Sequence, residues 1–277
     1  MSLAKATEII DRLSDMNVFT IALGGGEPFL HPDLFAIAEY ARSKQIVPNI
    51  TTNGSLINRQ NTQECRVFGN IHISCHEASE LEGLSAVVNR LRREGIIPGV
   101  NLLVSSRSYA QLPNIMRWCS QHQVAQVLVL KFKLTRENRE YKELLLTPSQ
   151  EIGLIPRVRS LSRKYHLVLM LDCSLFPALA AHNIRMRDLE FMDVNGCQGG
   201  NAYLAITTDG RYKPCSFCET TFGTLDSLNT ETWYQSEALQ RFRQQRLHPD
   251  CHTCRYLDLC NGGCRVCLDQ GCLANKP

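Results

Sequence analysis

Short apolar runs and longer helical stripes follow one another along most of the chain. Residues 4–16 place apolar side chains at spacings of four and three, which predicts a helix. Residues 18–23 form a run of apolar and β-branched side chains that stops at Gly24, which predicts a buried strand. A helix from Pro32 onward and a strand over 47–51 are predicted next. The chain therefore begins as an alternation of helices and strands.

The same alternation continues to residue 172. Further strands are predicted over 70–74, 99–104, 126–131 and 167–172. Further helices are predicted over 81–91, 112–121 and 148–164. Strands separated by helices are typical of an α/β fold with a parallel sheet, and such sheets bind ligands at the carboxyl ends of their strands. The candidate ligand loops are those that contain Gly25, Asn53, Ser74 and Asn101.

The β/α pattern stops before the C-terminal third of the chain. Two short segments, 203–207 and 211–214, predict a hairpin, and a helix is predicted over 230–246. A cysteine-rich segment follows that helix. We therefore predict two domains, a β/α domain over residues 1–195 and a small cysteine-rich domain over 196–277.

Composition and charge exclude several classes of protein. The net charge of the 277-residue chain is only +3, and its basic residues are scattered, so we expect no nucleic-acid surface. No apolar run reaches membrane-spanning length, and the N-terminus lacks a signal-peptide pattern. We expect a cytoplasmic, reducing location, where cysteines bind metal and do not form disulfides. The charged run over 131–139 is predicted to be a solvated face, or else a guide for a peptide substrate.

Cysteines supply the strongest chemical signal. Nine of the thirteen lie in the predicted C-terminal domain: Cys197, Cys215, Cys218, Cys251, Cys254, Cys260, Cys264, Cys267 and Cys272. Thiolates spaced in this way bind either iron-sulfur clusters or zinc. We expect iron-sulfur clusters, with a zinc site as the alternative. Three others have no partner spacing and are predicted to be small buried residues: Cys65, Cys75 and Cys119. Four histidines are predicted to be hydrogen-bonded structural residues: His72, His76, His122 and His166.

A glycine-rich turn, Gly24-Gly25-Gly26-Glu27-Pro28, ends the first predicted strand. Glycines allow a small polar ligand to approach the backbone closely, and Glu27 adds a negative charge suited to an ammonium group. A tight turn without a ligand is the alternative.

The sequence Gly25-Gly26-Glu27-Pro28, followed by Thr51-Thr52-Asn53-Gly54, resembles the radical S-adenosylmethionine (SAM) superfamily. The C-terminal cysteine spacing resembles the SPASM extension of that superfamily, which carries two auxiliary 4Fe-4S clusters. The resemblance implies a partial (β/α)6 radical SAM barrel that lacks its first strand, followed by a SPASM domain with a hairpin and a helix.

The resemblance also implies site residues. The SAM-binding residues would be Gly25, Gly26, Glu27, Asn53 and Ser74. One auxiliary cluster would be held by Cys197, Cys215, Cys264 and Cys218, and the other by Cys251, Cys254, Cys260 and Cys272. Cys173 and Cys267 are the alternates for the fourth ligands. No residue can be named as a catalytic acid or base.

The function implied by the resemblance is peptide or protein modification of the maturase type. In such enzymes a third 4Fe-4S cluster binds SAM, and an electron from this cluster cleaves SAM to a 5'-deoxyadenosyl radical. The radical abstracts a substrate hydrogen atom. A donor such as a flavodoxin or ferredoxin supplies the electron. The C-x3-C-x2-C motif for that cluster is missing from residues 1–195, so we expect an N-terminally truncated chain that does not cleave SAM. The alternative is a non-enzymatic iron-sulfur or zinc scaffold that binds a peptide partner.

Overall fold

The computed structural model describes residues 1–191, 195–244 and 249–267. The chain divides into two compact units. Unit 1 consists of Met1–Leu103, Ala110–Val129 and Leu161–Met170. Unit 2 consists of Val104–Tyr109, Leu130–Ser160 and Leu171–Pro277. The domain boundary expected near residue 195 stays a prediction.

Six strands form a parallel sheet in the order β1-β2-β3-β4-β5-β6. They are β1 (Thr20–Leu23), β2 (Val47–Thr52), β3 (Ile71–Cys75), β4 (Gly99–Val104), β5 (Val127–Lys131) and β6 (Leu169–Leu171). The spatial order equals the chain order, because each helical connection returns the chain to the next position in the sheet. The sheet curves as a half-barrel, and the predicted α/β class is confirmed.

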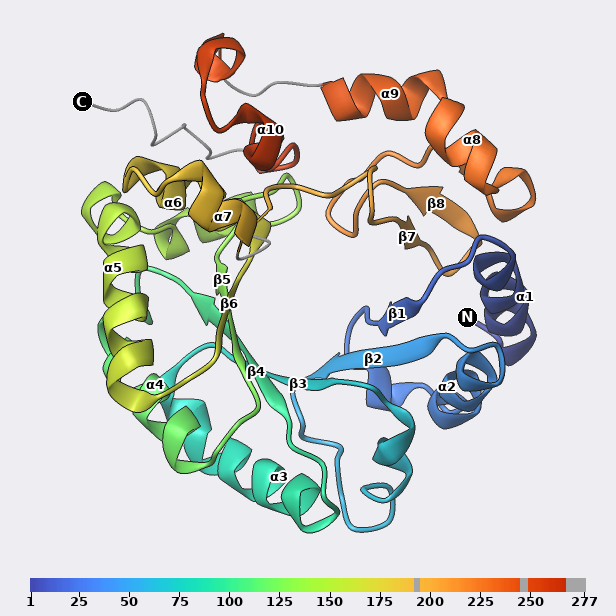
Figure 1. The fold of residues 1–277 in the computed structure, drawn as a ribbon. Helices are drawn as coiled ribbons and strands as arrows, with labels where there is room; N and C mark the ends of the chain where they lie inside the picture. The colour runs from blue at the N-terminus through green and yellow to red at the C-terminus, as the bar shows by residue number, and fades with distance from the viewer. Residues whose placement is uncertain (192–194, 245–248, 268–277) are drawn as a thin grey trace. The chain divides into compact units, whose positions relative to one another are not determined.

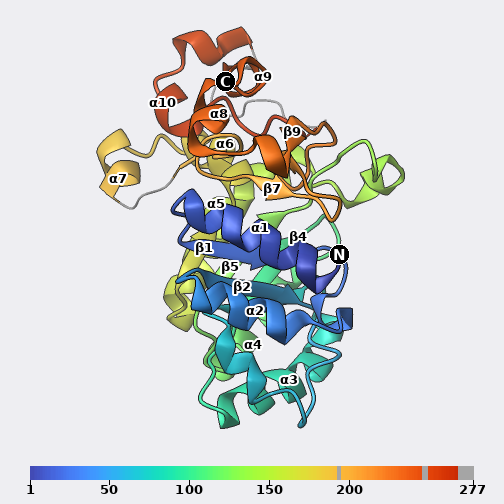
Figure 2. The same cartoon turned by 90° about the vertical axis from the view of Figure 1, so that its right-hand side faces the viewer.

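Five longer helices connect or flank these strands: α1 (Leu3–Asp15), α2 (Leu34–Ser43), α3 (Leu81–Arg93), α4 (Leu112–Gln121) and α5 (Pro148–Tyr165). Helices α1 and α2 lie side by side against β1 and β2 (Figure 1), and the second view shows the same arrangement (Figure 2). Their apolar stripes, which include Ile9, Leu13 and Ile37, are buried. The periodicity that predicted these helices therefore marks their core-facing sides.

The two faces of the sheet differ in chemistry. Ile50, Ile73 and Val100 are buried on one face. On the other face, the amide of Asn101 donates to Thr51 Oγ1 at 3.2 Å, and its Oδ1 lies 2.6 Å from His72 Nδ1. His72 Nε2 lies 2.9 Å from the amide nitrogen of Gln126, so the imidazole donates through Nδ1 and accepts through Nε2. His72 is thus a hydrogen-bonded structural residue, as predicted.

Unit 2 contains a second, antiparallel sheet of three short strands: β7 (Ala205–Ile206), β8 (Arg211–Lys213) and β9 (Gly223–Thr224). The predicted hairpin is confirmed as β7 and β8, whereas β9 was not predicted. The helices of this part are α6 (Phe176–Ala181), α7 (Met186–Phe191), α8 (Thr230–Gln235), α9 (Glu237–Gln244) and α10 (Leu257–Cys260).

The single helix predicted over 230–246 is wrong, because the chain forms α8 and α9 instead. Ser236 ends α8 with a non-helical backbone, and its hydroxyl accepts a hydrogen bond from the amide of Leu239 at 3.4 Å. A serine in this position starts a new helix by capping it. Asn229 caps α8 in the same way through Thr232.

Short 3-10 turns complete the described chain: η1 (Pro28–Leu30), η2 (Glu64–Val67), η3 (Ala78–Glu80), η4 (Tyr109–Gln111), η5 (Arg139–Leu144), η6 (Cys173–Leu175), η7 (Leu225–Ser227) and η8 (Pro249–Thr253). Among the described residues, no helix is both long enough and apolar enough to cross a bilayer.

Candidate functional site

The glycine-rich turn after β1 is open to a ligand. At Gly24, Gly25 and Gly26, an added methyl group would meet no atom within 4 Å. Gly25 has a φ of +136°, which a side chain would strain. The backbone amides and carbonyls of this turn are therefore accessible, as the sequence predicted for a loop that a small polar ligand approaches.

Glu27 fastens the glycine-rich turn to the loop after β2. Its Oε1 accepts hydrogen bonds from the Thr52 hydroxyl at 2.7 Å and from the amide of Phe29 at 3.2 Å. Its Oε2 accepts from the amide of Asn53 at 2.9 Å. A carboxylate has about four acceptor positions, so one position on Oε2 remains for a ligand. Glu27 thus works as a clamp between two strand ends as well as a source of negative charge.

Asn53 and Ser74 lie at or near the next two strand ends. The Oδ1 atom of Asn53 accepts from the amide of Ser55 at 2.8 Å, which fixes the turn and directs the side chain. Ser74 is half-buried on β3 and is paired in register with Asn101 on β4. These positions suit contacts to a ligand at the carboxyl ends of the strands, and the assignment of both residues to SAM stays a prediction.

In unit 2, Cys173 and Cys197 meet although they lie far apart in the sequence. The Cys173 thiol donates a hydrogen bond to Cys197, which lowers the pKa of Cys197 well below its ordinary value. The same contact raises the pKa of Cys173. Gly199 lies beside Cys197 and Cys215, because a methyl group there would be 3.4 Å from both Cys197 Sγ and Cys215 Cβ. The structure thus brings the alternate ligand Cys173 to the first predicted cluster ligand.

A second close thiol pair consists of Cys264 and Cys267. A hydrogen bond from Cys267 lowers the pKa of Cys264, and the charge of Lys133 acts in the same direction. Cys218 instead donates to the carbonyl of Thr220 at 3.5 Å, and burial raises its pKa. Within the predicted first ligand set, Cys197 and Cys264 therefore each have a thiol partner, whereas Cys215 and Cys218 have hydrogen bonds with the backbone.

The cysteines predicted for the second cluster lie around α10. Cys251 lies in η8, and its carbonyl accepts a hydrogen bond from the amide of Cys254 at 3.2 Å. Cys254 and Cys260 pack against a buried apolar cluster that includes Phe176 and Tyr256. The fourth predicted ligand, Cys272, lies outside the described residues.

Lys133 was missed by the sequence analysis. The prediction of a solvated face over 131–139 is wrong for both lysines, since the side chain of Lys131 is 5% exposed and that of Lys133 is 9% exposed. Lys131 pairs with Glu151 at 2.7 Å, and Lys133 pairs with Asp172 at 2.9 Å. The remainder of the run behaves as predicted at Arg136, whose side chain is 70% exposed.

Lys133 connects two cysteine-bearing segments of unit 2. Its ion-pair partner Asp172 directly precedes Cys173. Its ammonium also lies 4.9 Å from the ring centre of Phe217, which stands between Cys215 and Cys218 in the sequence. No sequence signal pointed to this role, because the partners of Lys133 are distant along the chain.

The chemistry of the donors fits a metal centre. Among the described residues, no three Cys, His, Asp or Glu side chains come close enough together to hold one metal ion. None of the described cysteines forms a disulfide. The thiols meet in pairs, and a thiol with a lowered pKa supplies the thiolate that iron and zinc bind. The donor type therefore suits iron-sulfur or zinc binding, although a complete ligand set is not assembled in this part of the chain.

The other cysteines behave as predicted. Cys65, Cys75 and Cys119 are completely buried. Burial raises the pKa of Cys65 and of Cys75 to about 12, and that of Cys119 further. Such thiols stay protonated near neutral pH, so they act as small apolar core residues.

Comparison with known proteins adds two kinds of finding. Residues 197–255 match the SPASM family, an iron-sulfur cluster-binding domain. Over 95% of its length the chain is 21% identical to the AdoMet-dependent heme synthase of Methanosarcina barkeri, of which it covers 81%. Over the same share it is 22% identical to the mycofactocin maturase MftC of Mycobacterium tuberculosis, of which it covers 70%.

Among solved structures, the fold is similar to that of SuiB from Streptococcus suis. In the structure of SuiB bound to S-adenosylmethionine, the TM-score is 0.74 at 18% identity, over 96% of this chain and 66% of SuiB. SuiB has also been solved bound to the precursor peptide SuiA. The chain spans just under two thirds of SuiB, and at this identity the likeness describes the fold.

Proposed function

This chain is related to the radical SAM enzymes that carry a SPASM domain, and from that premise we propose that it is the SAM-binding and cluster-binding part of a peptide- or protein-modifying maturase. The reaction of the whole protein would be hydrogen-atom abstraction from a peptide or small protein. The maturase name of MftC and the peptide-bound structure of SuiB support this substrate class. A flavodoxin or ferredoxin in a reducing cytoplasm would supply electrons.

The observation that carries the proposal is the clamp made by Glu27. It holds the open glycine-rich turn beside Asn53, so two strand-end loops form one polar surface. In the proposed complex, the backbone at Gly25 and Gly26 and the remaining lone pair of Glu27 bind the SAM ammonium group. Asn53 and Ser74 contact other polar groups of the cofactor.

For the first auxiliary cluster we propose Cys197, Cys215, Cys264 and Cys173 as ligands. The hydrogen bond between Cys173 and Cys197 supports Cys173 as the fourth ligand in place of Cys218. For the second cluster we retain Cys251, Cys254, Cys260 and Cys272. When bound, such clusters accept or relay electrons, and they also join distant segments of a small domain.

Replacing Glu27 with glutamine is expected to weaken SAM binding by roughly ten- to a hundredfold, because a charge-assisted hydrogen bond contributes about 1.5–3 kcal/mol. In the unaltered chain the backbone amide of Asn53 donates to Glu27 Oε2. The side-chain NH2 group of glutamine at that position would be a second donor and could not accept this hydrogen bond. Titration calorimetry of SAM against the purified chain measures the effect. Glu8→Gln removes the same charge from an exposed pair with Lys5 and should leave binding unchanged. Equal affinities for E27Q and the unaltered chain would contradict the proposed site.

We expect no 5'-deoxyadenosine from the 277-residue chain when SAM and dithionite are supplied. The C-x3-C-x2-C spacing occurs only at Cys260, Cys264 and Cys267, which are not on a loop of the β/α half. The product is measured by chromatography, with a SAM-cleaving enzyme as positive control. Detection of 5'-deoxyadenosine above the protein-free background would contradict this expectation.

The same missing motif favours a second candidate function, a non-enzymatic scaffold that binds a peptide partner. Metal analysis of protein purified without oxygen separates the two. The maturase proposal predicts about eight irons and eight sulfides per chain, as two 4Fe-4S clusters require. One or two zinc ions without iron would support the scaffold, because zinc carries no electrons.

A further inference from the structure

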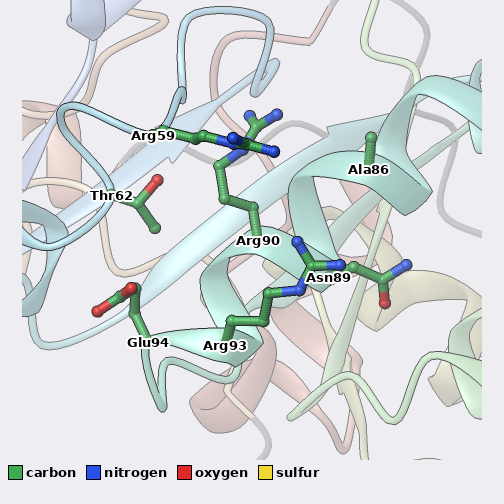
Figure 3. A pocket seen from close by; sticks show the side chains of 7 residues that line it. All are labelled: Arg59, Thr62, Ala86, Asn89, Arg90, Arg93 and Glu94. Carbon is green, nitrogen blue, oxygen red and sulfur yellow. The ribbon is translucent and has the colours of Figure 1, made fainter.

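A basic pocket on unit 1 is lined by none of the residues assigned to SAM or to the clusters. Its cavity volume is about 480 Å³, and it lies between the last turns of α3 and the loop that follows β2 (Figure 3). Three arginines line it, Arg59 from the loop and Arg90 and Arg93 from the helix. In Figure 3 the Arg59 side chain reaches from the loop toward α3, and Arg90 extends from the helix toward it. Pockets of this size accept small ligands or short peptide segments.

The backbone that carries Arg59 is fixed by its own neighbours. Asn58 Oδ1 accepts from the amide of Gln60 at 2.8 Å, and Asn61 Oδ1 accepts from the amide of Asn58 at 2.9 Å. The side-chain amide of Asn61 donates to the carbonyl of Leu56 at 2.9 Å. Because these bonds hold the loop without any ligand, little ordering of the loop is needed when a ligand binds.

Arg90 joins the loop to the helix. One of its terminal nitrogens donates to the carbonyl of Ile57, which fixes the distance between the two walls of the pocket. The guanidinium still lines the cavity. Both walls are therefore held in place before binding.

The positive charge of the pocket is not neutralised within the described residues. Arg59 and Arg93 have no hydrogen-bond or ion-pair partner in that part of the chain. The one acidic lining residue, Glu94, pairs with Arg66 at 3.2 Å. Two unpartnered guanidinium groups and a third that keeps most of its donors thus face one cavity.

Stabilisation of the C-terminus of α3 does not account for these arginines. The last carbonyl there, that of Glu94, already accepts two hydrogen bonds from Arg66 at 3.0 and 3.1 Å. Arg92 is used elsewhere, on the carbonyl of His122. The negative end of a helix carries only about half a charge, which three guanidinium groups exceed. Helix stabilisation therefore does not account for the positive charge of this pocket.

We propose that this pocket binds an anionic ligand with two or more negative charges, either a phosphoryl group or neighbouring carboxylates of an acidic peptide. Guanidinium groups present paired N–H donors that match the oxygens of both ligand types. Asn89, which also lines the pocket, adds an amide donor. The inference does not depend on SAM or iron-sulfur binding, so it can fail or succeed independently of the proposed function.

Titration calorimetry at low salt tests the proposal. Pyrophosphate and the tetrapeptide Glu-Glu-Glu-Glu are titrated separately into the 277-residue chain. Saturable binding of pyrophosphate identifies a phosphoryl ligand, and saturable binding of the peptide alone identifies carboxylates. The double variant Arg59→Gln/Arg93→Gln should bind the successful probe at least about tenfold more weakly, since two charge-assisted contacts are lost. Added salt should weaken binding by the unaltered chain.

The matched control is Arg117→Gln, which removes an exposed arginine of α4 outside the pocket. It should bind the probe with unchanged affinity. Thermal unfolding of each variant checks the fold, and both replaced pocket side chains are exposed, so no loss of stability is expected. Absence of binding by both probes, or equal affinity of the double variant and the unaltered chain, would overturn the proposal.

Discussion

The Lys133→Met variant should lose about 3–5 kcal/mol of unfolding free energy, because Asp172 would then be a buried carboxylate without its counter-charge. The two side chains are 9% and 15% exposed, and their nitrogen and oxygen lie 2.9 Å apart. Burial opposes ionisation of Asp172, but the Lys133 ammonium outweighs this effect and holds its pKa below the ordinary value. Urea denaturation monitored by circular dichroism measures the loss.

Two further variants make the Lys133 experiment specific. Arg136→Met removes a cation from the same segment, but its side chain is 70% exposed and lies 3.8 Å from Glu219, so it should change stability by less than about 0.5 kcal/mol. Asp172→Asn added to Lys133→Met removes the unpaired charge and should restore part of the loss. A similar effect for Lys133→Met and Arg136→Met would refute the buried pair.

Gly196→Ala is expected to have a comparable effect for a steric reason. The added methyl group would lie 2.0 Å from the Cys260 carbonyl oxygen and 2.7 Å from Cys260 Cα. The amide of Gly196 also donates to the carbonyl of Leu259 at 2.7 Å, so the contact cannot open without losing a hydrogen bond. We expect a loss of about 3 kcal/mol, from overpacking against backbone that cannot rotate away.

Gly83→Ala is the matched control for this glycine. Gly83 lies within α3, where a methyl group would meet no atom within 4 Å. The substitution should stabilise the chain by about 0.5–1 kcal/mol, because alanine has a higher helix propensity than glycine.

Gly196→Ala should also reduce iron binding, since it separates the segment before Cys197 from Cys260. Unchanged stability and unchanged iron content would disprove the packing argument.

Sequence periodicity predicted the fold of the β/α half well, because each helix and strand there buries one regular face. The helix predicted over 112–121 has those bounds as α4, and the strand predicted over 99–104 has those bounds as β4. Elements too short to repeat their own period were missed. Strand β9 has only two residues, and α6 has six.

The candidate site was predictable only where its chemistry is local. The glycine-rich turn is visible in the sequence because consecutive glycines have few other uses. The partner of Glu27, the Thr52 hydroxyl, is 25 residues away, and Asp172 is 39 residues from Lys133. Such contacts depend on which strands become neighbours. A charged run such as that of Lys131 and Lys133 has the same composition whether it is hydrated or buried.

The fully buried thiols of Cys65, Cys75 and Cys119 have a practical consequence for the biochemist. The thiolate is the form that attacks an alkylating reagent, and the high pKa values of these side chains keep them protonated in the folded state. Mass tagging of the native chain would therefore label cysteines of unit 2 and leave these three unlabelled. Comparing tags before and after iron loading would then report cluster occupancy against a silent background.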